Sequence, residues 1–310
     1  MPYQKIKMIY NPIANHGRAT SIIPALLSVL EEHGHASWAG TVYPGHAAEL
    51  ARDAAREGCD LVIAIGGDGT VHEVVNGLMQ LPAEDRPTLG VIPIGTGNDF
   101  SFSIGTPTDP VAALRRALLG TPHPVDIGKI TTPDGCIEYF SNAVGIGFDA
   151  IVVIHSRSVP VLQGFAVYLI AVLRTLIFNH HPFTLKMETE DSKEERALLM
   201  LAICNGQREG GGFNLVPDGQ SNDGWLDTVA LHRVTRFKLL FRTLVPFLKG
   251  THTNLPHVSM NKIRKLSIQS DIPLIIHADG EIYAGFGSDV RQLDFEILPA
   301  ALKASCEPRE

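Results

Sequence analysis

Two glycine-rich stretches of this sequence have the residue types that bind phosphate. In the first, the apolar run 61–65 leads into Gly66, Gly67, Asp68 and Gly69, and a helical pattern of apolar residues follows. Glycines permit backbone conformations that are closed to other residues, and free amide groups at the start of a helix bind phosphate without side chains. A carboxylate such as Asp68 repels a polyphosphate unless a cation or bound water lies between them. A magnesium nucleotide meets that requirement, whereas the alternative is a tight turn in which Asp68 caps the next helix.

The second stretch reads VIPIGTGNDF at residues 91–100 and has a similar arrangement. Gly95 and Gly97 flank Thr96, and the polar residues Asn98 and Asp99 follow. Loops at the carboxyl ends of strands in an open α/β sheet converge on a crevice, which is where such sheets bind ligands. These two loops are therefore expected to meet at one site, and the polar loop at 11–17, after the first apolar run, could join them.

The segments that carry these loops alternate between strand and helix patterns. After a first strand pattern that ends at residue 10, helical patterns and apolar runs follow in turn at 20–33, 36–42, 47–57, 61–65, 71–79 and 88–94. Strands separated by helices of that length require crossover connections, which predicts a largely parallel α/β sheet. After residue 127 the pattern changes to β-rich segments separated by Asp-Gly turn signals, which predicts a second, mostly antiparallel domain. A length of 310 residues also favours two domains.

The charge of the chain is unevenly distributed. A formal net charge of −7 disfavours nonspecific binding to nucleic acid. Residues 228–270, however, hold eight Lys or Arg residues and no Asp or Glu, with Phe and Leu residues between them. Part of this segment could be a basic amphipathic helix that rests on an anionic bilayer, or a surface helix that packs its apolar side on the core.

Other features of the chain indicate a cytoplasmic protein. Its first residues resemble a strand more than a signal peptide, and the four cysteines are too far apart to suggest a disulfide framework or a zinc site. The apolar stretch 161–178 contains Gln163, Tyr168 and Arg174, which favours a buried or interfacial helix over a membrane span.

Several motifs together resemble the diacylglycerol kinase catalytic family, which includes bacterial lipid kinases and sphingosine kinases. They are NPIANHGRA, GGDGTVHEVVNGL, PIGTGNDF, VDIG, NAVGIGFDA, NGQREGGGFNLVPDGQSNDGWLDT and HADGE, in the family's order and covering nearly the whole chain. The resemblance implies an α/β fold with an N-terminal open α/β domain like that of NAD kinases and a C-terminal, mostly antiparallel β-sandwich domain. The nucleotide-binding domain would be residues 1–128, with 289–310 returning to it, and the lipid-substrate domain would be residues 129–288.

The resemblance also implies the roles of individual residues. ATP would be surrounded by Asn11, Pro12, Ile13, Ala14, Asn15, Thr41, Gly66, Gly67, Asp68, Gly69, Thr70, Val71, His72, Gly95, Thr96, Gly97 and Asn98. The carboxylates of Asp68, Asp99 and Asp126 would organise Mg²⁺ and its water. Glu281 would accept the proton of a lipid hydroxyl as it attacks the γ-phosphate, with Asp279 supporting the metal or the base.

A second, structural Mg²⁺ is implied at a loop near residue 223. Asp223 would supply its side chain, and Gln220 and Trp225 their backbone carbonyls. The alternative interpretation of this Asn-Asp-Gly segment is a plain hairpin turn.

The sequence departs from the family pattern in two places. Asn15 stands where a glycine is usual, and Ser101-Phe102 stands where Ala-Arg is usual, so a cation that could hold phosphate or a carboxylate is missing unless Arg18 replaces it. The segment 145–150 fits the dinucleotide pattern G-x-G-x-x-A, but no βαβ unit surrounds it, and we interpret it as a chance match.

The sequence therefore predicts an ATP-dependent lipid kinase with diacylglycerol as the leading acceptor and phosphatidic acid as the product. The alternatives are an NAD kinase and a catalytically weak regulator that binds lipid or nucleotide. Its partners would be a lipid and, transiently, an anionic membrane surface, with no nucleic acid, and family analogy leaves a homodimer open.

Overall fold

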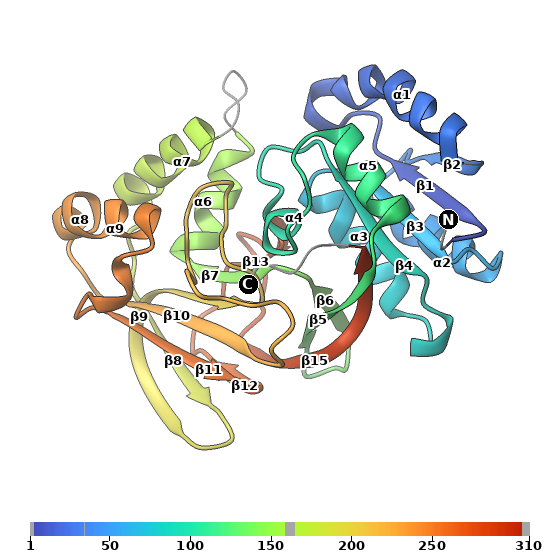
Figure 1. Ribbon diagram of the computed structural model, residues 1–310. Helices are drawn as coiled ribbons and strands as arrows, with labels where there is room; N and C mark the ends of the chain where they lie inside the picture. The colour runs from blue at the N-terminus through green and yellow to red at the C-terminus, as the bar shows by residue number, and fades with distance from the viewer. Residues whose placement is uncertain (1–2, 34, 159–164, 306–310) are drawn as a thin grey trace. The chain divides into compact units, whose positions relative to one another are not determined.

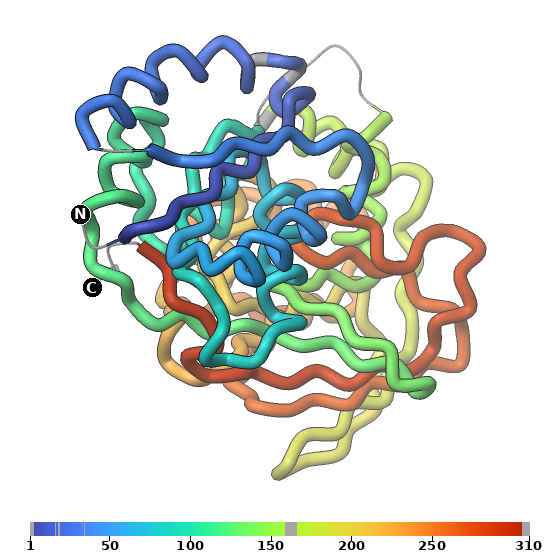
Figure 2. Tube along the Cα trace, turned by 90° about the vertical axis from the view of Figure 1, so that its right-hand side faces the viewer, coloured from blue at the N-terminus to red at the C-terminus, as the bar shows by residue number. Residues whose placement is uncertain are grey.

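The computed structural model describes residues 3–33, 35–158 and 165–305, and the chain forms two compact units (Figure 1). The first unit comprises residues 1–127 together with 299–310, and the second comprises residues 128–298. Strand β15, Gln292–Ser305, begins in the second unit and ends in the first. Figure 2 shows it in red, near the end of the chain. Each unit has buried apolar clusters of its own.

The first unit is built around a parallel sheet. Its strands lie in the order β2-β1-β3-β4, and the end of β15 pairs in parallel with β4. All residues of β3 are buried, as expected for a parallel strand that is covered on both faces. The α/β fold predicted from the alternating patterns is thereby confirmed. The elements are β1 (Ile6–Tyr10), α1 (Ala14–His33), β2 (Ala36–Gly40), α2 (His46–Arg56), β3 (Leu61–Gly66), α3 (Asp68–Met79), η1 (Ala83–Asp85), β4 (Thr88–Pro93), α4 (Asp99–Ser103) and α5 (Pro110–Leu119).

The helices of this unit pack on the sheet and on each other. Helices α1 and α5 share one apolar cluster with the sheet, whereas α2 and α3 pack against each other. Gly77 permits that second packing, because a Cβ atom there would lie 2.3 Å from the carbonyl oxygen of Ala48. The strand order reverses between β1 and β3, and open α/β sheets bind ligands beside such a switch point, at the carboxyl ends of the strands.

The second unit is mostly antiparallel, as predicted. The strand pairs whose register is described are antiparallel along the path β14-β13-β7-β9-β8-β12-β15 and through the branches β9-β10-β11 and β5-β6. Side chains of strand β9 pack on both faces of the sheet: Leu201 and Ile203 belong to one apolar cluster, and Ala202 and Cys204 belong to another. The strands are β5 (Pro122–Thr131), which enters from the first unit, β6 (Ile137–Phe140), β7 (Ala143–Gly147), β8 (Phe183–Glu188), β9 (Lys193–Cys204), β10 (Leu226–His232), β11 (Val258–Ile263), β12 (Lys265–Gln269), β13 (Ile276–Ala278) and β14 (Glu281–Ala284).

Helices cover one of the two apolar clusters of this unit (Figure 1). They are α6 (Phe148–Ser156), α7 (Phe165–Phe178), α8 (Arg236–Lys238), the π-helical turn η2 (Leu239–Thr243), α9 (Leu244–Lys249) and the short 3₁₀ turn η3 (His252–Asn254). Part of the basic segment 228–270 is thus helical, with Leu239 and Phe247 buried. Helix α7 covers most of the apolar stretch 161–178, of which 161–164 lie outside the described residues. Among the described helices, none has the length and hydropathy to span a membrane.

Candidate active site

The two glycine turns of the first unit touch backbone to backbone. A Cβ atom on Gly95 would lie 2.4 Å from the Cα of Gly67, and one on Gly67 would lie 3.1 Å from the Cα of Gly95. Asn98 shapes the second turn with a φ of 52°, which asparagine tolerates better than most residues. Its side-chain oxygen accepts from the N–H of Gly95, and its side-chain NH₂ donates to the carbonyl of Gly95, both at 2.8 Å. The two predicted loops therefore meet, and small residues make the contact.

Asp68 connects the two turns through its carboxylate. It lies in the first turn of α3, and its two oxygens accept hydrogen bonds from the backbone N–H groups of Asn98 and Asp99, each at 2.7 Å. Gly97 gives the carboxylates room, because a Cβ atom there would lie 2.7 Å from Oδ2 of Asp68 and 2.9 Å from Oδ2 of Asp99. The carboxylate is thus held at the carboxyl edge of the sheet, beside the backbone of both turns.

The three carboxylates expected around Mg²⁺ do not form one tight ligand set. Asp126 is buried, and its Oδ1 accepts from the N–H of Ala300 at 2.7 Å, which ties β5 to β15. In the parts of the chain that the structure describes, one group of three side chains has ligand atoms that all lie within 4.8 Å of one another, and it is not this one. Mg²⁺ keeps several waters and binds one or two carboxylates, so the oxygens of Asp68 and Asp99 fit a hydrated ion.

The loops after β1 and β2 continue the same edge. The N–H of Asn11 donates to the carbonyl of Ile65 at 3.1 Å, and the N–H of Thr41 donates to that of Tyr10 at 2.9 Å. Asn15 has a φ of 49°, in the left-handed region that favours glycine and that asparagine also enters. Asn15, in the first turn of α1, therefore has a backbone conformation that glycine could also adopt.

Some of the predicted nucleotide residues are packed inside the unit. The side chains of Thr70, Val71 and His72 are buried, and a Cβ atom on Gly66 would lie 2.2 Å from Oγ1 of Thr70. Ile13, in contrast, is 78% exposed. Thr70, Val71 and His72 therefore support the turn from within, whereas Ile13 and Thr96 are exposed.

Asp279, in the second unit, is used to hold the backbone. It has a φ of 50°, and Gly280 follows with a φ of 80°. Its Oδ1 accepts from the N–H groups of Asn142 and Ala143, and its Oδ2 accepts from the N–H and hydroxyl of Ser141, over 2.8 to 3.1 Å. This carboxylate fixes the turn between β13 and β14 to the start of β7, and so positions the residues that follow it.

Glu281 directly follows that turn and pairs with an arginine. One guanidinium nitrogen of Arg157 lies 2.6 Å from Oε2 of Glu281 and donates to the carbonyl of Gly280 at 2.9 Å. The Glu281 side chain is 47% exposed, so it remains accessible to a substrate. Arg157 could not be assigned a role from the sequence, because it lies 124 residues from Glu281 and outside every motif.

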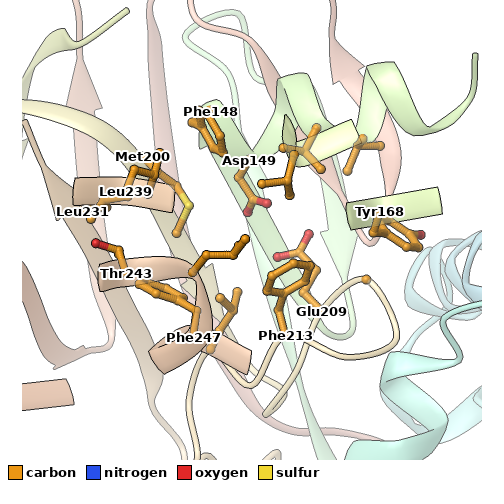
Figure 3. Close-up of a pocket in the computed structure, with 16 residues that line it drawn as sticks. Phe148, Asp149, Tyr168, Met200, Glu209, Phe213, Leu231, Leu239, Thr243 and Phe247 are labelled. Carbon is orange, nitrogen blue, oxygen red and sulfur yellow. The ribbon is translucent and has the colours of Figure 1, made fainter. Parts of the chain in front are cut away.

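The second unit also contains an apolar pocket beneath its helices (Figure 3). Its walls come from α6, α7, β9, β10, η2 and α9, with side chains such as Val172, Leu239 and Phe247. Two acidic residues, Asp149 and Glu209, line it, and their carboxyl groups point toward each other in Figure 3. Such a pocket can hold an alkyl chain and place a polar group beside the carboxyls.

His277 completes this polar end. Its Nε2 lies 2.6 Å from Oε1 of Glu209 and 3.5 Å from Oδ2 of Asp149, and the three residues form the one tight group noted above. Burial lowers the pKa of His277, but the charges of Glu209 and Asp149 outweigh it and raise the pKa to about 10. Burial raises the pKa of Glu209 to about 7, helped by the charge of Asp149 and opposed by His277. None of these three residues was predicted to have a role, although each lies within one of the motifs that resemble the family.

The residues expected to hold a second Mg²⁺ do not fit an ion. The ammonium of Lys262 lies 2.5 Å from Oδ2 of Asp223 and 3.7 Å from Oδ2 of Asp227. The guanidinium of Arg264 also lies over the ring of Trp225, at 4.4 Å from its centroid. Two cationic side chains therefore already stand at this loop, and they would repel a divalent ion.

Comparison with known protein families matches both parts of the chain. Residues 5–130 match the model of the diacylglycerol kinase catalytic domain, and residues 142–306 match that of the YegS C-terminal NAD kinase beta sandwich-like domain. A probable lipid kinase YegS-like from Chromohalobacter salexigens is 34% identical over 81% of this chain and 79% of that protein. A diacylglycerol kinase from Bacillus subtilis is 30% identical over 91% of each chain.

Solved structures show the same fold. The crystal structure of a putative diacylglycerol kinase from Bacillus anthracis superposes with a TM-score of 0.80 at 24% identity, covering 99% of this chain and 97% of that one. The likeness therefore extends over both units.

Proposed function

Because the chain belongs to the diacylglycerol kinase catalytic-domain family, we propose that it transfers the γ-phosphate of Mg-ATP to a lipid hydroxyl. Diacylglycerol is the first candidate acceptor, with phosphatidic acid as the product, since several relatives are named diacylglycerol kinase. The observation that carries the proposal is the bridge from Asp68 to the amides of Asn98 and Asp99, which joins two glycine turns at the switch point of the sheet.

The first unit would bind the nucleotide. Closely packed turns without side chains let phosphate oxygens approach backbone N–H groups, as at other helix starts that bind phosphate. When bound, Mg²⁺ would offset charge on the phosphates. Asp68 and Asp99 would hold its water, and the loops that contain Asn11 and Thr41 would lie along the rest of the nucleotide.

Glu281 would act as the proton acceptor. It stands on a turn that Asp279 fixes, it is partly exposed, and Arg157 holds its carboxylate in one orientation. A positioned carboxylate that removes the hydroxyl proton typically contributes about 10²- to 10⁴-fold to a rate. The bond from oxygen to the γ-phosphorus would form as the bond to the β-phosphate oxygen breaks, and the proton would pass to Glu281.

The apolar pocket of the second unit would hold an alkyl chain of the lipid. Its walls are hydrocarbon and aromatic side chains, and a polar group of the lipid would face Asp149.

The helices around this pocket would rest on an anionic bilayer. Phe237 is 69% exposed and Phe241 is 62% exposed, and their rings lie 4.6 Å apart on the outer side of α8 and η2. The segment 236–249 has four Lys or Arg residues and no Asp or Glu. Helix α7 adds an outward apolar stripe that ends in Ile177 and Phe178. Exposed aromatic residues beside basic ones are the composition of peripheral membrane contacts.

A transfer assay tests the proposed reaction. Labelled γ-phosphate from Mg-ATP would be offered to diacylglycerol and other lipids in mixed micelles, with NAD as a soluble control acceptor. We expect a labelled lipid with the native protein and at least a hundredfold lower rate with Glu281→Gln, which should still bind ATP. The exposed carboxylate of Glu188 provides the matched control, because Glu188→Gln should leave transfer unchanged. Labelled NADP, or full activity of Glu281→Gln, would contradict the proposal.

A further inference from the structure

Glu209 enters the apolar pocket from a tight turn after β9. Its backbone exchanges two hydrogen bonds with Phe213, at 2.8 and 2.9 Å. Gly210 and Gly211 between them have φ values of 62° and 70°, and a Cβ atom on Gly210 would lie 3.1 Å from the ring of Tyr168. Positive φ values without side chains let this turn fold close against α7. The Glu209 side chain is consequently directed inward, and the residue is 9% exposed.

The polar end of the pocket is closed on its other side. A Cβ atom on Gly145 would lie 2.2 Å from Nε2 of His277 and 2.3 Å from Oδ2 of Asp149, so the backbone of β7 presses directly on these side chains. On the other side, both carboxyl groups line the pocket, from which a ligand could reach them.

The polar end of the pocket has two acidic side chains and one basic side chain. His277 offers one imidazole to two carboxyl groups: its Nε2 lies 2.6 Å from Oε1 of Glu209, whereas Oε2 of Glu209 has no hydrogen-bond partner among the described residues. A buried carboxyl oxygen without a donor is costly, and a ligand that brings a donor would relieve that cost. A ligand that brings negative charge would increase it.

The imidazole faces the carboxyls with a protonated nitrogen. The N–H of Gly280 lies 3.3 Å from Nδ1 of His277, which favours a proton on Nε2 in the neutral ring, and the charged ring has one there as well. A transition metal would need Nε2 without its proton, so the same three residues favour a hydrogen-bond donor over a metal ion.

We propose that Glu209, held in place by His277, is a specificity-determining residue that binds a hydroxyl or ammonium group on a long-chain amphiphile and selects against anionic head groups. This inference rests on the proposed function for its place in a kinase, but it is a statement about binding alone. It predicts an acceptor with a donor at the polar end of the pocket in addition to the hydroxyl that is phosphorylated, such as a monoacylglycerol or a long-chain amino alcohol. Diacylglycerol has one free hydroxyl, so it would bind at the polar end of the pocket less tightly than these acceptors.

Direct binding to the full chain without ATP tests the inference. Three probes with the same alkyl chain would be titrated calorimetrically below their micelle concentrations: a monoacylglycerol, a primary alkylamine and an alkyl phosphate. The native protein should bind the first two at least tenfold more tightly than the phosphate. Glu209→Gln should lower the affinity for the alkylamine about tenfold, as expected for the loss of one hydrogen bond to a charged group. The ratio between the affinities for the amine and for the alkyl phosphate should therefore become smaller.

A control variant distinguishes the effect of Glu209 from a general change of the pocket. Met200 lines the apolar wall of the same pocket, and Met200→Leu should change the affinities of all three probes equally. Equal binding of the amine and the phosphate by the native protein would overturn the inference even if Glu209→Gln failed to fold. This binding experiment contains no nucleotide and does not depend on the kinase reaction. Selective binding here, combined with no labelled lipid in the transfer assay, would refute the kinase and leave the role of Glu209 standing.

Discussion

The guanidinium group of Arg157 lies 2.6 Å from the carboxylate of Glu281, although 124 residues separate them in the chain. Arg157 follows the last residue of α6, and its second hydrogen bond, to the carbonyl of Gly280, ties it to the turn that carries Glu281. Arg157 is thus a cation that holds the Glu281 carboxylate.

Arg157 should be a positioning residue for transfer. Replacement by alanine frees the Glu281 carboxylate to rotate, so we expect kcat to fall about tenfold with little change in the KM for ATP, and Arg157→Lys to restore part of it. The decisive measurement is a double-mutant cycle, in which Arg157→Ala should add almost nothing to Glu281→Gln. Additive losses would mean that Arg157 acts elsewhere. Arg56, whose exposed side chain also pairs with a carboxylate, provides a control through Arg56→Ala.

Gly95→Ala should disrupt nucleotide binding. Its Cβ atom would lie 2.4 Å from the Cα of Gly67, so the two phosphate turns must separate, at a cost of about 1 to 3 kcal/mol in unfolding free energy. Thermal stabilisation by Mg-ATP should be lost with it. Gly285→Ala is the matched control, since its Cβ atom would make an ordinary contact of 3.4 Å. Normal ATP stabilisation of Gly95→Ala would argue against this phosphate site.

Lys262 should take the place of a structural metal ion. The native protein is expected to show the same melting temperature with Mg²⁺ or with a chelator in the absence of ATP, because an ammonium already faces Asp223. Lys262→Ala should melt at a lower temperature and should gain stabilisation by Mg²⁺. Adding Asp223→Asn should remove that gain. A native protein that Mg²⁺ stabilises without nucleotide would show that the loop binds the ion after all.

Stability should fall as the pH rises from about 5 to about 9. Glu209 has a folded pKa of about 7 against 4.5 ordinarily, and His277 has one of about 10 against 6.5. In each case the folded protein keeps a proton that the unfolded chain releases, so stability decreases with pH across both windows, by up to about 1.4 kcal/mol per pH unit for each proton. In denaturant titrations, the unfolding free energy of Glu209→Gln should depend less on pH between about 4.5 and 7 than that of the native protein. A stability that rises over this range would contradict the assigned charges.

The outer phenylalanines should govern membrane contact. Phe237 and Phe241 lie outside the apolar core, so their joint replacement by serine should leave the melting temperature within a few degrees of native and lower binding to anionic vesicles at least tenfold. Binding should also weaken with salt, because the basic residues of 236–249 act through charge. The exposed Ile272, on a loop of the same unit, offers the control Ile272→Ser. Unchanged vesicle binding would exclude this surface.

Local features of the fold could be predicted because buried parallel strands leave a continuous apolar run. The run 61–65 became β3, Leu61–Gly66, and 88–94 became β4, Thr88–Pro93. The meeting of the two glycine turns followed from the same reasoning, since parallel strands end at a common edge. Helix α6 was not predicted, because Ile151, Val152 and Val153 are β-branched and burial overrides their weak helix propensity.

The polar pairs of the second unit could not be predicted from the sequence. Arg157 follows helix α6 and Glu209 lies in a turn after β9, whereas Glu281 and His277 lie on β14 and β13, so each pair joins elements that are distant in the sequence. Periodicity reports the face on which a side chain lies, but it does not report its partner on another element. Such pairs become visible only in three dimensions.

Strand β15 determines the order in which the two units can be completed during synthesis. The first unit obtains its last sheet strand, and the N–H of Ala300 that binds Asp126, from the final part of the chain. During synthesis, residues 1–127 leave the ribosome first but must wait with an open sheet edge until the entire second unit has been translated. Domains are generally completed in the order of their synthesis, and here the order is reversed. A ribosome that stalls before residue 299 would therefore hold an incomplete nucleotide-binding unit with an exposed β4 edge.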